Sequence, residues 1–241
     1  MVRFNGNAEA FEMLDNSLIR LYLRAGCNVM LCNYRGVNPT RRSRKFDASY
    51  STSRDLKLKE DSSILQKTVG KFVRKLERLV NWCVVTERDS MILDAEAVLQ
   101  YLIRVHQVRR SRLLVFGHSI GGAVAAILSD KYQTPTCNSR SFARLSKIVS
   151  GWEMEVARRW PRICRSKWTE YCVGDKIIPY TCSLHHAVHK MKGDVPASGS
   201  KGSSLSLEVL DADNHNRIYT KTELAKHVSL MRRALRLSAR A

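Results

Sequence analysis

The sequence lacks long apolar runs and is poor in acidic and aromatic residues. No apolar stretch reaches the roughly 18 residues expected of a membrane-spanning helix. The 22 Asp and Glu residues are outnumbered by 41 Lys and Arg, which gives a formal net charge of +19. Such an excess points to nucleic acid or an anionic membrane as a partner. However, aromatic residues make up only 7% of the chain and no nucleic-acid-binding motif is present, so nucleic acid is disfavoured.

The cysteines are odd in number, and their spacing is not that of a ligand set. They never form a C-x-x-C pair, and they are scattered along the chain as Cys27, Cys32, Cys83, Cys137, Cys164, Cys172 and Cys182. This pattern suits neither a disulfide framework nor a zinc site, and it favours a reducing compartment. Since Met1 opens no signal-peptide pattern, we expect a cytoplasmic protein, with peripheral membrane association as an open alternative.

The most informative stretch is 112–130, which reads RLLVFGHSIGGAVAAILSD. Residues 113–116 are short and apolar enough for a buried strand, and 123–128 read as a helix. The G-x-S-x-G between them predicts that Ser119 lies on a nucleophile elbow. So sharp a turn needs neighbours without side chains, and it brings the Ile120 N–H to a helix N-terminus, where an oxyanion would find donors. The alternative is an ordinary Gly-rich turn.

Strand and helix patterns alternate along the rest of the chain. The expected elements are the end of a strand at 1–4, helix 9–25, strand 27–32, helix 94–108, helix 142–160, weak strand 164–173, helix 183–191, strand 205–209 and helix 223–237. Gly26 is suited to cap the first helix, and Asp94 is expected as an N-cap. The polar stretch 131–141 contains Pro135 and is a poor strand. The alternation predicts one α/β domain, 1–241, with a doubly wound, mostly parallel sheet flanked by helices.

A basic insertion, 38–90, interrupts this alternation. Its first part is polar and rich in Ser and Arg, which is typical of a loop. Residues 63–85 instead place an apolar stripe opposite lysines and arginines, which predicts a basic amphipathic helix. Such a helix could lie on an anionic membrane or cover an active site as a lid. It could equally pack on its own domain with a solvated basic face.

Further motifs follow the elbow in a recognisable order. GDKIIP at 174–179 contains Asp175, and DNHNR at 213–217 contains His215. Ser, Asp, His is the order of triad residues in the α/β-hydrolase fold. With NYRG at 33–36 and NGNAE at 5–9, these motifs resemble the α/β-hydrolase superfamily over nearly the whole chain. The resemblance is closest to its esterase and serine-peptidase-like branch with NYRG and GHSIGG motifs.

The resemblance implies a role for each matched residue. Ser119 would be the nucleophile, His215 the general base and then acid, and Asp175 the group that fixes the histidine's tautomer. Backbone N–H groups of Ile120 and Asn7 would form the oxyanion hole. Such a site would cleave an ester, thioester or amide of a small-molecule, lipid or peptide acyl substrate through an acyl-enzyme. It requires no metal or organic cofactor.

The identity of the acid and of the base leaves alternatives. Asp175 could be a turn residue, with Asp211 or Asp213 as the true acid, and six other histidines compete with His215. We favour His215 because it lies in the loop that follows the last predicted strand.

The family's sheet also has more strands than this sequence contains. Its strand order is 1-2-4-3-5-6-7-8, but the first two strands have no counterpart here and the third is reduced to 1–4. We therefore expect an N-terminally truncated fold that is weakly active or prone to aggregate. The alternative function is that of an inactive relative that binds a partner or a membrane through its basic surface.

Overall fold

The computed structural model describes residues 1–7, 9–11, 14, 16–35, 37, 88–144, 154–193, 205–210, 215–216 and 219–237. Almost all of the predicted basic insertion (38–90), with its amphipathic helix at 63–85, lies outside these residues. Asp211 and Asp213 lie outside them as well.

The described strands form one parallel sheet in the order β2-β1-β3-β4-β5-β6. They are β1 (Val2–Phe4), β2 (Met30–Leu31), β3 (Val115–His118), β4 (Thr136–Ser139), β5 (Lys167–Cys172) and β6 (Leu205–Leu210). Every pair of neighbours is parallel. This confirms the fold class predicted from the alternating pattern, and β1 lies between β2 and β3 as the family order implies.

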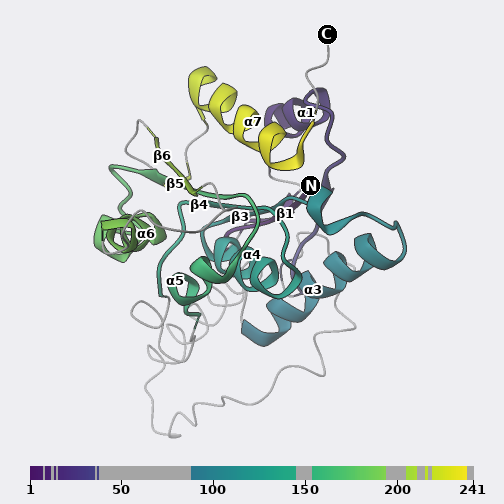
Figure 1. The fold of residues 1–241 in the computed structure, drawn as a ribbon, viewed down its shortest axis with the longest axis horizontal. Helices are drawn as coiled ribbons and strands as arrows, with labels where there is room; N and C mark the ends of the chain where they lie inside the picture. Colours follow the sequence, from purple (N-terminus) through teal and green to yellow (C-terminus); the bar gives the residue numbers. More distant parts are fainter. Residues whose placement is uncertain are drawn as a thin grey trace, which may run out of the picture.

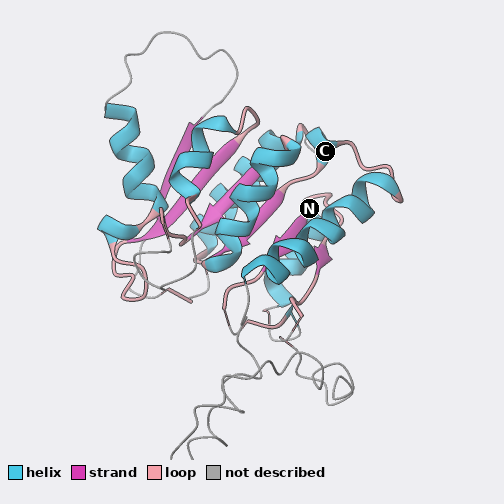
Figure 2. Ribbon diagram, turned by 90° about the horizontal axis from the view of Figure 1, so that it is seen from below, coloured by secondary structure: helices cyan, strands magenta, loops and turns pink. Residues whose placement is uncertain are grey.

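Helices cover both faces of the sheet (Figure 1). One face is covered by α1 (Asn16–Arg24) and α7 (Lys221–Leu235), and the other by α3 (Arg88–Arg104), α4 (Ile120–Tyr132), α5 (Val156–Arg159) and α6 (Leu184–Gly193). Single-turn 3-10 helices occur at Arg110–Arg112, Trp160–Arg162 and Tyr180–Cys182. Figure 2 shows the strands side by side with helices crossing over them.

The apolar core is divided by the sheet into two layers. Successive side chains of a strand point to opposite faces, so Val115 packs with α3 and α4, whereas Leu114 and Phe116 pack with α1 and α7. Helix α4 is buried around most of its circumference, as expected of a helix that is apolar on all sides. It lies directly behind β3 and so fixes the point at which the chain turns from strand to helix.

Two N-terminal elements are shorter than predicted. Helix α1 begins at Asn16 rather than at residue 9, although Gly26 closes it with φ 87° as expected of a glycine cap. Strand β2 comprises only Met30 and Leu31 of the predicted 27–32. Its length is limited by its partner, because β1 offers it only the register Val2↔Met30 and Arg3↔Leu31.

The prediction that Asp94 caps a helix is wrong. Helix α3 begins six residues earlier, at Arg88, so Asp94 lies within the helix rather than at its start. Its carboxylate instead accepts hydrogen bonds from the backbone N–H and from Nε of Arg35, each at 2.8 Å. This contact ties the NYRG loop to α3.

Strand β4 occupies the polar stretch that reads poorly as a strand. Pro135 precedes the strand and therefore removes no ladder hydrogen bond. The buried hydroxyls find distant partners: Thr136 donates to the Val115 carbonyl at 2.9 Å, and Ser139 Oγ lies 3.0 Å from the Tyr219 hydroxyl. Of the predicted helix 142–160, residues 145–153 lie outside the described part of the chain; α5 covers Val156–Arg159, and Phe142 forms an isolated bridge with Ser183.

No helix in the described ranges combines the length and the apolarity needed to cross a membrane.

Candidate active site

Ser119 occupies a strained turn between β3 and α4. Its φ of 53° and ψ of −120° lie in a region that side-chain-bearing residues rarely adopt. Hydrogen bonds hold this conformation: Ser119 N–H donates to the Ser139 carbonyl, and Gly122 N–H donates to the Ser119 carbonyl, each at 3.0 Å. The strain is therefore imposed by the neighbouring strand and by the first turn of the helix.

Glycines are required on both sides of this turn. A Cβ at Gly117 would lie 2.2 Å from the Gly121 carbonyl oxygen, and one at Gly121 would lie 2.3 Å from the carbonyl oxygen of Phe4. Both distances are far below van der Waals contact. The glycines thus allow β1, β3 and α4 to approach one another closely, as predicted for a nucleophile elbow.

Asp175 and His215 are brought into direct contact. Nδ1 of His215 lies 2.6 Å from Oδ2 of Asp175, while Oδ1 accepts the N–H groups of Ile177 and Ile178, each at 2.9 Å. Burial raises the pKa of Asp175, but the hydrogen bonds from His215 and from the two N–H groups outweigh it, so the net effect lowers the pKa. A carboxylate held ionised in this way orients the imidazole with its Nδ1 toward the acid.

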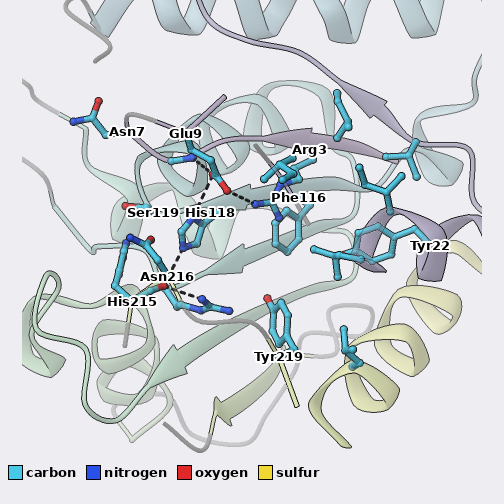
Figure 3. Close-up of a pocket in the computed structure, with 18 of the residues that line it drawn as sticks. Arg3, Asn7, Glu9, Tyr22, Phe116, His118, Ser119, His215, Asn216 and Tyr219 are labelled. Carbon is cyan, nitrogen blue, oxygen red and sulfur yellow. Dashed lines mark hydrogen bonds and ion pairs between the residues drawn. The ribbon is translucent and has the colours of Figure 1, made fainter. Parts of the chain in front are cut away.

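Ser119 and His215 line the same cavity but are not hydrogen-bonded to each other (Figure 3). Among the described residues, none is a hydrogen-bond partner of the buried Nε2 of His215. In unliganded enzymes this contact is often long and shortens when substrate binds. The contact between His215 and Asp175 is thus present, whereas a hydrogen bond between Nε2 of His215 and Ser119 is not.

The backbone of His215 is held by two side chains. Nη1 of Arg140 donates to its carbonyl at 2.8 Å, and Nε2 of His118 lies 3.3 Å from the same oxygen. Arg140 directly follows β4 and is buried, with φ 50°. Arg140 was not predicted from the sequence. Its position directly after β4 was the only available signal, and β4 itself reads poorly as a strand.

The loop that carries Asn7 lies beside Ser119. A Cβ on Gly6 would be 3.4 Å from the Ser119 Cβ, and Asn7 lines the same cavity as Ser119. Since Ile120 is the first residue of α4, the two predicted oxyanion donors belong to segments that flank Ser119.

Glu9 anchors this loop, a role that the sequence did not reveal. Its carboxylate accepts the Gly6 N–H at 2.6 Å and Nη2 of Arg3 at 2.8 Å, and it lies 3.5 Å from Nδ1 of His118. Burial raises the pKa of Glu9, but His118, Arg3 and the Gly6 N–H together lower it to about 2. The side chain is therefore an anion throughout the physiological pH range.

The cavity has a volume of about 620 Å³ and extends from Ser119 toward α1 (Figure 3). Its lining is largely apolar and aromatic, with contributions from Leu14, Leu18, Ile19, Tyr22, Val29, Leu31, Phe116, Ile177, Tyr219 and Leu224. A concave, mostly apolar site with a few polar groups at one end is typical of a small-molecule pocket.

A second buried cluster lies on the α7 side of the sheet. Ligand-type atoms of Cys137, Glu170 and His227 lie within 4.8 Å of one another. However, Oε1 of Glu170 is already 2.5 Å from Nδ1 of His227, and Oε2 accepts the Tyr219 hydroxyl at 2.5 Å. Because these donors and acceptors satisfy one another directly, the cluster fits a hydrogen-bonded core better than a metal centre.

The sequence matches no protein-family model and no curated protein, but the structure resembles many solved structures. TT1662 from Thermus thermophilus is 12% identical with a TM-score of 0.62, over 98% of this chain and 89% of that one. The esterase Pf2001 from Pyrococcus furiosus is 14% identical with a TM-score of 0.60, over 96% and 81%. Acetyl xylan esterase 1 from Thermoanaerobacterium is 13% identical with a TM-score of 0.52, over 95% and 73%. A structure described as a putative α/β hydrolase, from Agrobacterium tumefaciens, is 13% identical with a TM-score of 0.58, over 98% and 85%. Together with the elbow and the strand order, these similarities show that the chain has the α/β-hydrolase fold.

Proposed function

We propose that the protein is a serine hydrolase that cleaves an ester, thioester or amide through an acyl-enzyme on Ser119. The observation that carries the proposal is the single cavity lined both by a serine on a strained elbow and by the histidine of a buried His215–Asp175 pair. The two similar structures described as esterases support hydrolysis as the reaction class.

The geometry suggests how the first half of the reaction would proceed. With the proton of His215 on Nδ1, facing Asp175, Nε2 accepts the Ser119 hydroxyl proton as Oγ attacks the substrate carbonyl. The oxygen of the tetrahedral intermediate accepts the N–H groups of Ile120 and Asn7. Collapse of the intermediate breaks the bond to the leaving group, which takes the proton from His215 Nε2.

The second half repeats these roles with water. Nε2 of His215 removes a proton from a water molecule, whose oxygen attacks the acyl carbonyl on Ser119. The bond to Oγ breaks, and the proton returns from His215 to the serine. The carboxylic acid leaves, and the triad recovers its initial protonation.

The decisive experiment is labelling with a fluorophosphonate probe, followed by mass spectrometry to locate the modified residue. We expect the probe on Ser119, and we expect Ser119→Ala to lose labelling together with nearly all esterase turnover, about 10⁴-fold or more. Ser111→Ala, at an exposed serine outside the cavity, is the matched control. Labelling that persists in Ser119→Ala would refute the assignment of the nucleophile.

The same experiment tests the alternative that the protein is an inactive relative. If the folded protein neither reacts with the probe nor hydrolyses activated esters, the elbow is a structural remnant. The binding-module interpretation would then be favoured.

A further inference from the structure

Two buried arginines, Arg3 and Arg140, line the cavity that contains the proposed nucleophile. Figure 3 shows Arg3 in this lining. Arg3 is 6% exposed and Arg140 is 4% exposed, although arginine is rarely buried so deeply in a protein. Among the described residues that line the cavity, only Glu9 carries a carboxylate. The lining therefore contains two guanidinium groups and one acidic group. The rest of the lining is mostly apolar, where charges are only weakly screened.

Two contacts fix Arg3 in the wall of the cavity. Its Nη2 is bound to Glu9, and its guanidinium stacks over the Phe116 ring, 4.9 Å from the centroid. Its Nε has no accessible surface and makes no hydrogen bond to any described residue, so a ligand in the cavity would meet the terminal N–H groups of the guanidinium.

Arg140 brings the second charge close to the reacting groups. Its guanidinium stacks over the Tyr219 ring at 4.9 Å, and Nη1 binds the His215 carbonyl at 2.8 Å. The charge of Arg140 is thus held against the backbone of the proposed base.

Both guanidinium groups belong to the lining of one cavity, which also contains Ser119. Burial lowers the pKa of His118, the contact with Glu9 raises it, and the charges of Arg140 and Arg3 lower it. Both arginines therefore act on the residue that directly precedes Ser119. Two guanidinium groups in the lining of one largely apolar cavity are suited to bind a carboxylate, whose two oxygens match their donors.

From this arrangement we infer that the acyl substrate carries a carboxylate, which Arg3 and Arg140 bind. The inference rests on the proposed function, because it names the substrate class of the same site. It predicts that esters of dicarboxylic acids are hydrolysed in preference to esters of simple fatty acids of equal length.

The test compares two esters of 4-methylumbelliferone, the adipate half-ester and the hexanoate, which differ by a terminal carboxylate in place of a methyl group. We expect kcat/KM for the half-ester to exceed that for the hexanoate by about tenfold or more, the effect of one charge-assisted hydrogen bond. Arg3→Gln should reduce this ratio by roughly tenfold. The ratio is used because it cancels any general loss of activity.

Arg158→Gln is the matched control. Arg158 is also bound to a glutamate, Glu155, at 2.8 Å, but it is exposed and lies outside the cavity. The ratio should be unchanged in this variant. If Arg3→Gln does not fold, Arg3→Lys retains the charge without the planar fork and should give an intermediate ratio. A wild-type protein that prefers the hexanoate, or a ratio that Arg3 variants leave unchanged, would overturn the inference.

A binding measurement separates this inference from the proposed function. Monomethyl adipate and methyl hexanoate are titrated into Ser119→Ala protein and followed by ligand-observed NMR. We expect monomethyl adipate to bind more strongly than methyl hexanoate, and we expect the double variant Ser119→Ala, Arg3→Gln to lose this difference. That result would support the carboxylate site even if no ester is hydrolysed. Equal binding of the two esters counts against the site, whatever the result of fluorophosphonate labelling.

Discussion

Nδ1 of His215 lies 2.6 Å from Oδ2 of Asp175, a contact between residues that are 40 positions apart in the chain. The contact directs Nε2 of the imidazole away from the acid. In Asp175→Asn the amide can donate a hydrogen bond to Nδ1 and so favour the wrong tautomer. We expect kcat to fall by about 10⁴-fold while the fold is retained, as judged by circular dichroism and steady-state ester hydrolysis.

The other two candidate acids serve as controls for this substitution. Asp211→Asn and Asp213→Asn change the same chemical group in the segment just before His215. Both should hydrolyse esters at rates close to wild type. A silent Asp175→Asn combined with an inactive Asp213→Asn would transfer the acid role to Asp213.

Glu9 should act as a positioning residue for the oxyanion donors. Because its carboxylate binds the Gly6 N–H, Glu9→Gln should loosen the loop that carries Asn7. We expect kcat to fall by about ten- to a hundredfold, less than for loss of a whole donor, with a smaller change in KM. The affinity for a trifluoromethyl ketone, whose adduct carries the oxyanion, should fall in parallel.

Glu96→Gln is the control for Glu9. Glu96 also accepts hydrogen bonds from a cationic and a neutral side chain, Lys131 and Tyr132, but it lies outside the cavity. Its kcat and its ketone affinity should match wild type. Unchanged ketone affinity in Glu9→Gln would restrict Glu9 to a purely structural role.

Acid should destabilise the fold through Glu170. Burial raises the pKa of this carboxyl, but its contacts with His227, Tyr219 and Ser139 lower the pKa from 4.5 to about 2. A carboxyl with a depressed pKa stabilises the folded state fully above its unfolded value and progressively loses that effect as the pH falls through the folded value. The window for the loss therefore runs from about pH 4.5 down to about pH 2.

Urea unfolding at neutral and acid pH tests this linkage. Glu170→Gln should lower the free energy of unfolding at pH 7 by about 1.5–3 kcal/mol, since it disrupts buried hydrogen bonds to an ionised carboxylate. The difference from wild type should shrink at pH 3. Glu155→Gln, which breaks only surface ion pairs, should cost at most about 1 kcal/mol. A difference that is constant with pH would show that Glu170 is not titrating in this window.

The elbow could be predicted from the sequence because its determinants are local. The steric need for Gly117 and Gly121, and the apolar runs on either side, all fall within one short segment. The limits of strand β2 could not be predicted, because they depend on how much of β1 is available for pairing. Asp94 was misassigned because its partner, Arg35, is distant in the chain.

The supporting residues of the site were hidden for a similar reason. Ser139 and Arg140 are polar residues in a stretch with no strand pattern, and their burial is stabilised by Tyr219 and by the His215 carbonyl. No residue close to Ser139 or Arg140 in the sequence indicates that Tyr219 and His215 are their partners. The motifs thus located Ser119, Asp175 and His215, whereas the groups that hold them in place emerged only from the three-dimensional arrangement.

The position of His118 also bears on how this site could diverge. One imidazole contacts Glu9, which holds the loop on one side of Ser119, and the carbonyl of His215, which lies on the other. Substitutions at Glu9 and at Arg140 would therefore both change the surroundings of His118. The effects of substitutions that share a contact are not additive. Homologues that replace His118 should carry compensating changes at both Glu9 and Arg140, so that these positions covary as one unit.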